Sequence, residues 1–80
     1  MNYSEKQNKI RDALEDFKES LALDTKKENA GILDGLGCCY HAMSEFDEGI
    51  KYFNEALAKE PQNIEFLKNR AQCYYDMNEF

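Results

Sequence analysis

The sequence predicts an all-α fold of about four helices that pack as antiparallel pairs, and three observations lead to this prediction. Apolar residues recur every three or four positions through most of the chain, which is the spacing of one helix face. The 80 residues include one proline, Pro61, and 32% are charged, a composition that leaves little room for a turn-rich sheet. The pattern C-Y-x-x-M-x-E-F occurs at residues 39–46 and again at residues 73–80, which indicates an internal repeat.

The first two helices are expected at about residues 5–23 and 29–43. Ser4 and Gln7 form a capping-box pair at the start of the first helix. Its apolar stripe, spaced by four, three and four residues, consists of Ile10, Leu14, Phe17 and Leu21. The polar segment DTKKEN, residues 24–29, interrupts this stripe. The second apolar face consists of Leu33, Leu36, Gly37, Tyr40 and Met43.

The third and fourth helices follow a predicted turn at Ser44 and Glu45. The third helix should run from Phe46 to about Glu60, because Pro61 has no amide hydrogen and disfavours helical geometry in the residue before it. Asn63 is placed to cap the fourth helix. The apolar residues of that last helix are Phe66, Leu67, Ala71, Tyr74 and Met77.

The internal repeat has a period of 34 residues. Six of the seventeen positions in residues 30–46 are identical to the residue 34 positions later, where about one identity is expected by chance. The first and third helices also match, at an offset of 36 residues, through Phe17 and Phe53, Leu21 and Leu57, and two further pairs. The repeating unit is therefore a pair of antiparallel helices.

Residues 30–63 resemble a tetratricopeptide repeat. The residues that carry the resemblance, at the spacing typical of that family, are Leu33, Leu36, Gly37, Tyr40, Gly49, Phe53, Ala56 and Pro61. Leu33 replaces the usual tryptophan and Gly49 replaces the usual alanine. The resemblance implies a fragment of a right-handed superhelix of stacked helix pairs. Residues 4–24 would be the second helix of a partial first repeat with an N-terminal extension, and residues 64–80 the first helix of a truncated third repeat.

The resemblance also implies a function, a protein-protein interaction scaffold that binds a partner in the concave groove lined by the first helix of each pair. The groove residues of this chain would then be Gly31, Asp34, Gly35, Cys38, His41 and Ala42, followed by Glu65, Lys68, Asn69, Gln72, Tyr75 and Asp76. Gly31 and Gly35 each cost about 1 kcal/mol relative to alanine within a helix. Either a bulky partner side chain or a helix packs on them, or they form a weak helix that its neighbours support.

The charge pattern restricts the expected partner. If the complete repeat were the first of the carboxylate clamp of this family, the clamp would need a lysine and an asparagine where Asp34 and Cys38 stand, and its other registers fail as well. Asp34, Glu65 and Asp76 would repel an acidic tail, so we expect a basic or apolar protein segment. The formal charge of −6 argues against nucleic acid as a partner, and the sequence has no apolar run that suits a membrane. Two alternatives stay open: a spacer in a cytoskeletal or ciliary assembly, and a regulatory repeat attached to an enzyme domain outside this chain.

Catalysis and cofactor binding are not expected. Cys38 and His41 lie three residues apart, but Cys39 and Cys73 occupy equivalent repeat positions, where free cysteine packs as a small apolar residue. We therefore predict no metal, no cofactor and no enzyme activity, with Cys38 accessible and the other two cysteines buried. The odd number of cysteines favours a reducing, cytoplasmic location.

The last helix leads to one further expectation about association. Its apolar residues should pack partly on the preceding helix, while their outward flank should suit a following helix. We therefore expect end-to-end self-association.

Overall fold

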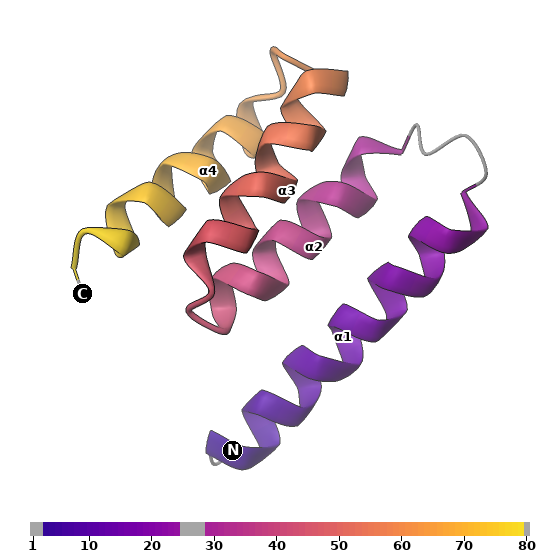
Figure 1. The fold of residues 1–80 in the computed structure, drawn as a ribbon, viewed down its shortest axis with the longest axis vertical. Coiled ribbons are helices and arrows are strands. Elements are labelled where there is room, and N and C mark those ends of the chain that lie inside the picture. The colour runs from indigo at the N-terminus through magenta and orange to yellow at the C-terminus, as the bar shows by residue number, and fades with distance from the viewer. Residues whose placement is uncertain (1–2, 25–28, 80) are drawn as a thin grey trace.

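The computed structural model describes residues 3–24 and 29–79, and its regular structure is helical (Figure 1). Four helices follow one another: α1 (Tyr3–Leu23), α2 (Ala30–Ala42), α3 (Phe46–Lys59) and α4 (Ile64–Met77). The predicted all-α fold of four helices is confirmed. The predicted boundaries agree to within about three residues, although most of the DTKKEN segment lies outside the described residues.

One predicted helix cap is wrong and one is confirmed. α1 begins at Tyr3, so Ser4 already lies within the helix and does not precede its first turn. Ser4 therefore has helical backbone geometry, whereas an N-cap residue lies outside the helix in a non-helical conformation. At α4 the side chain of Asn63 accepts a hydrogen bond from the backbone amide of Phe66 at 3.1 Å, as predicted.

The turn between α2 and α3 is a Schellman motif centred on Ser44. The amide of Glu45 donates to the carbonyl of Tyr40, and the amide of Ser44 donates to the carbonyl of His41, both at 2.9 Å. Ser44 has a φ of 62°, a left-handed conformation that usually belongs to glycine. This tight turn places α3 directly against α2 as an antiparallel pair.

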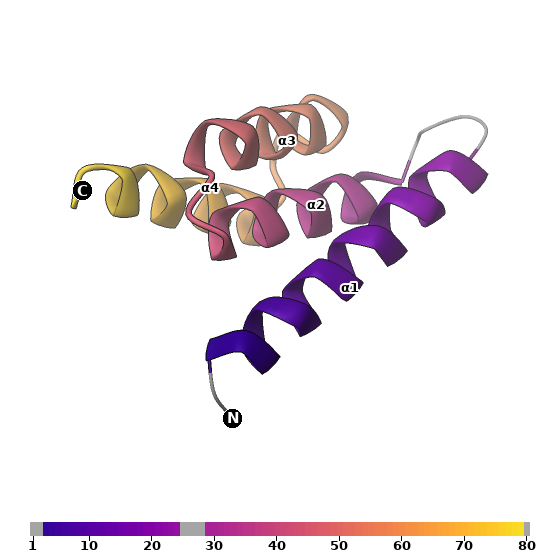
Figure 2. The ribbon, with the colours of Figure 1, turned by 60° about the horizontal axis from the view of Figure 1, so that its bottom comes forward.

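The helices form a layered arrangement in which α2 has a central position. α2 and α4 run in the same direction and lie in one layer, with α3 packed across both (Figures 1 and 2). α1 packs mainly on α2, and it diverges from α2 toward its own N-terminus (Figure 2). The side of α2 that faces away from α3 therefore meets α1.

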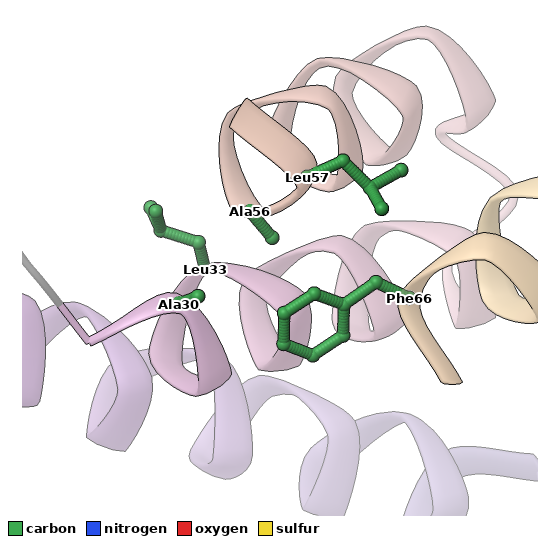
Figure 3. Packing of buried hydrophobic residues seen from close by; sticks show 5 residues of the cluster. All are labelled: Ala30, Leu33, Ala56, Leu57 and Phe66. Carbon is green, nitrogen blue, oxygen red and sulfur yellow. The ribbon is translucent and has the colours of Figure 1, made fainter. Parts of the chain in front are cut away.

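The core consists of two clusters. One joins α2, α3 and α4 through Ala30, Leu33, Ala56, Leu57 and Phe66 (Figure 3). The other joins α1 to α2 through Leu14, Leu36 and Cys39. Full burial of a leucine or phenylalanine side chain contributes about 1.5–3 kcal/mol, so these clusters fix the positions of the helices.

Candidate functional site

Two pairs of the predicted groove residues meet across α2 and α4, and we call the surface predicted along these two helices the α2–α4 face. It comprises Gly31, Asp34, Cys38 and His41 of α2 with Glu65, Lys68, Asn69, Gln72, Tyr75 and Asp76 of α4. Two contacts link the helices across this face. Asn69 Nδ2 donates to Asp34 Oδ1 at 3.0 Å, and His41 Nε2 lies 2.5 Å from Asp76 Oδ2.

The carboxylate of Asp34 lies half-buried on this face. Burial raises its pKa, the hydrogen bond from Asn69 acts in the opposite direction, and the negative charge of Glu65 raises the pKa further. The charged form of Asp34 is thus held in an environment that disfavours it. A cation beside Asp34 would offset the free-energy cost of ionising its carboxylate.

The carboxylate of Asp76 is held in a different way. The hydrogen bond with His41 lowers its pKa most, and Gln72 Nε2, which donates to Asp76 Oδ1 at 3.0 Å, lowers it further. The ring of His41 also lies tilted against Phe46, with 5.9 Å between the ring centroids. Asp76 therefore stays ionised and connects α4 to the start of α3 through His41.

The remaining predicted residues of α4 point outward. Glu65, Lys68 and Tyr75 are exposed, and Tyr75 keeps 63% of its surface accessible. A large exposed aromatic side chain beside carboxylates can contact both an apolar group and a cation of a partner.

The structure differs from the prediction at Gly35. This residue is buried, and the ring of Phe17 from α1 occupies the space where a side chain at position 35 would lie. The physical reason is that Phe17 needs apolar cover, and α2 offers the closest approach at a residue without a side chain. Gly35 is therefore not part of an open wall, and the helix that packs on it is α1 of the same chain.

A second surface lies between α1 and α2, and we call it the α1–α2 groove. It has a volume of about 550 Å³ and is largely apolar. Its lining consists of Lys6, Lys9, Ile10, Ala13 and Phe17 from α1 with Gly31, Asp34, Gly35, Cys38, Cys39 and Ala42 from α2. The sequence interpretation missed the α1 side. The signal was present, because Ala13 and Phe17 lie 36 residues before Gly49 and Phe53, which face α2 in the complete repeat.

The three cysteines have the accessibility that the sequence predicts, with Cys38 exposed and both Cys39 and Cys73 buried. The Cys38 sulfur lies 4.0 Å from a carboxylate oxygen of Asp34. Its surroundings raise the pKa of Cys38 to about 11, chiefly by desolvation and then by the charge of Asp34. Such a thiol is a poor nucleophile at neutral pH.

The described residues provide neither a metal site nor a membrane-spanning helix. Over residues 3–24 and 29–79, no group of three or more histidine, cysteine, aspartate or glutamate side chains could hold a metal ion. Within the same part of the chain, no helix combines the length and the apolar character that crossing a bilayer requires.

Comparison with known proteins places the chain in a family. The tetratricopeptide repeat family matches residues 30–63. Tetratricopeptide repeat protein 16 of Mus musculus is 32% identical over 63 residues, covering 72% of this chain and 8% of that protein. Tetratricopeptide repeat protein 8 of Caenorhabditis elegans is 34% identical over 56 residues, covering 70% of this chain and 11% of that protein.

The chain thus spans about a tenth of the length of these two relatives, and no solved structure matches it significantly. The family match supports the predicted complete repeat, while the assignment of residues 4–24 and 64–80 to partial neighbouring repeats stays a prediction. The repeat residues, the paired helices and the relatives agree, and this chain belongs to the tetratricopeptide repeat family.

Proposed function

We propose that this chain binds a protein or peptide segment on the α2–α4 face. Tetratricopeptide repeats generally mediate protein-protein interactions. The observation that carries the proposal is the pair of links Asp34–Asn69 and His41–Asp76, because they hold the two helices side by side before any partner arrives. A surface that is already ordered loses less entropy on binding than a flexible one.

The partner segment carries basic and apolar side chains. Asp34, Glu65 and Asp76 bring three carboxylates to the α2–α4 face, while Lys68 supplies one positive charge. A lysine or arginine beside Asp34 would offset the repulsion between Asp34 and Glu65 that contributes to the raised pKa of Asp34. Apolar side chains of the partner would pack on exposed Tyr75.

A peptide selection tests this proposal. A random peptide display library is selected against the 80-residue chain, and two of the selected peptides are titrated into isotope-labelled chain by NMR. The proposal predicts peptides enriched in lysine, arginine and apolar residues. It also predicts that the largest amide shifts fall on α2 and α4, around Asp34, Asn69 and Gln72.

A charge-reversed version of each selected peptide, with glutamate in place of every basic residue, serves as the matched control. It should bind at least about tenfold more weakly. Acidic peptides among the selected binders, or shifts centred on the exposed side of α3 around Asn54 and Ala58, would contradict the proposal.

We also propose that the chain self-associates end to end. Leu67 is 39% exposed and Tyr74 is 46% exposed, and the two residues lie two turns apart on one side of α4. Apolar side chains exposed along a helix favour contact with another helix. Sedimentation equilibrium checks the proposal, because the apparent mass should rise with concentration.

A further inference from the structure

The exposed side of α4 corresponds to a side of α2 that is covered. Leu67 and Ala71 stand 34 residues after Leu33 and Gly37. Leu33 and Gly37 are buried beneath α3, whereas Leu67 and Ala71 are exposed. α4 therefore presents the surface with which the first helix of a pair meets its second helix.

α1 presents the opposite half of such a pair. Ala13 and Phe17 correspond to Gly49 and Phe53 of α3, which pack on α2 in the complete repeat. A Cβ atom built on Gly49 would lie 3.2 Å from the carbonyl oxygen of Gly37, so the backbones of the pair approach closely there. In α1 the equivalent residues border the α1–α2 groove.

We propose that α4 of a second copy of this chain docks in the α1–α2 groove. α4 of one copy and α1 of the next then form a complete helix pair between two chains. The proposal rests on the self-association proposed above, to which it assigns a surface, a direction and a register. The contact is heterologous, so each copy can use both ends and short head-to-tail assemblies form.

The register follows from the contacts within one chain. α2 and α4 run in the same direction, and their linked residues are 35 positions apart, as Asp34–Asn69 and His41–Asp76 show. If α4 of one copy and α2 of the next are offset along their axes in the same way, Lys68 lies beside the helical turn of α2 that contains Asp34 and Gly35. This offset also places the large Tyr75 side chain against the small Ala42 side chain, which lines the groove.

Charge supports the same direction. When α4 runs parallel to α2 and antiparallel to α1, its C-terminal end lies beside the N-terminal part of α1. Asp76 and the exposed Glu79 then face the exposed Lys6 and Lys9. At the other end Lys68 meets Asp34. The reversed direction would bring Glu65 toward Lys9 but would also leave Glu79 beside Asp34, so we assign the parallel direction.

Site-specific cross-linking in the 80-residue chain tests the inference. One preparation carries Cys38→Ser with Ala13→Cys, and the other carries Cys38→Ser with Ala71→Cys. Ala13 and Ala71 belong to α1 and α4, and the register places them at the close approach that Gly49 and Gly37 make within one chain. A mixture of the two preparations should form a disulfide-linked dimer under mild oxidation.

The matched control replaces Ala13→Cys by Ala22→Cys, which lies exposed on the same helix away from the groove. We expect at least about fivefold less linked dimer with Ala22→Cys. In parallel, Leu67→Glu in the unlinked chain should weaken association at least about tenfold, measured by sedimentation equilibrium. Leu23→Glu, at another exposed apolar residue, should change it less than about twofold.

The outcomes separate the two proposals. A chain that is monomeric at every concentration overturns self-association and, with it, this inference. A chain that associates but links Ala22→Cys as readily as Ala13→Cys keeps self-association and overturns the α1–α2 groove as its surface. Preferential linkage through Ala13→Cys, lost on Leu67→Glu, supports the inference.

Discussion

Gly37 of α2 lies directly beneath the ring of Phe53 of α3, so that a Cβ atom built on Gly37 would stand 2.6 Å from Phe53 Cε1. Phe53 is fully buried and cannot move aside. Overpacking a core costs about 1–3 kcal/mol, which exceeds the roughly 1 kcal/mol that alanine gains over glycine in a helix. We predict that Gly37→Ala lowers the free energy of unfolding, measured by urea titration.

Gly35→Ala is the matched control for that prediction. A Cβ atom at Gly35 also meets an aromatic ring, that of Phe17, but Phe17 is only partly buried and its ring can swing into the α1–α2 groove. We therefore expect Gly35→Ala to change stability by less than about 1 kcal/mol. Equal losses of stability on Gly37→Ala and Gly35→Ala would show that α1 is held as rigidly against α2 as α3 is.

Ser44 offers a stabilising substitution. Its left-handed conformation costs a residue with a side chain about 1–2 kcal/mol, and glycine removes most of that cost. Ser44→Gly should raise the free energy of unfolding by about 0.5–1 kcal/mol, after allowing for the greater flexibility of glycine in the unfolded chain. Ser44→Val should lower it, because a β-branched residue adopts this conformation least readily. A loss of stability with Ser44→Gly would contradict the turn described above.

Asp34 and Asp76, two of the three carboxylates of the α2–α4 face, should respond oppositely to pH. Burial raises the pKa of Asp34, so ionisation of Asp34 destabilises the folded state. The free energy of unfolding should therefore fall as pH rises through the folded pKa of Asp34. Asp34→Asn keeps an acceptor for Asn69 and should be more stable than the native chain at pH 7. The difference should vanish below the ordinary aspartate pKa of 3.8.

Asp76 provides the comparison. Its pKa is lowered by His41 and Gln72, so it stabilises the folded state above pH 3.8, and this contribution is lost as pH falls through its folded pKa. Asp76→Asn should therefore be less stable than the native chain at pH 7 and should converge with it in acid. Thermal unfolding from pH 2.5 to pH 7 measures the stability of both variants. If Asp34→Asn and Asp76→Asn changed stability in the same direction at pH 7, the opposite roles of the two carboxylates would be contradicted.

Thiol labelling tests the environment of Cys38. We predict that Cys38 reacts before Cys39 and Cys73, because it alone among the three cysteines is exposed. A pKa of about 11 should nevertheless make it at least about tenfold slower at pH 8 than an ordinary thiol of pKa 9.0. Asp34→Asn should accelerate the reaction, since the charge of Asp34 is the second cause of the raised pKa. Mass spectrometry of the labelled chain follows all three sites.

The helices and the complete repeat could be predicted because helix periodicity and the 34-residue spacing are local properties of the sequence. Phe53, Leu36 and Cys73 are all buried as their repeat positions require. The same reasoning placed Asp34, His41 and Asn69 on one surface. It did not predict which residues pair. The linked residues are 35 positions apart, one more than the repeat period of 34, and this difference depends on the position of α4 along the axis of α2.

The position of α1 could not be predicted in the same way. The sequence identifies Phe17 as an apolar residue of the first helix, but its contact with Gly35 depends on the angle at which α1 crosses α2. No spacing within a helix encodes that angle. For the same reason the α1 lining of the groove, including Lys6 and Ile10, was outside the predicted site.

A charge reversal on the α2–α4 face shows whether this face binds a segment with basic and apolar side chains, as we propose. Isothermal titration calorimetry would compare a selected basic peptide binding to the native chain, to Glu65→Lys and to Glu55→Lys. Both glutamates are exposed, but Glu65 lies on the α2–α4 face and Glu55 on α3. We expect about three- to tenfold weaker binding for Glu65→Lys and less than about twofold change for Glu55→Lys. Equal affinities for the two variants, or a loss confined to Glu55→Lys, would contradict the proposal.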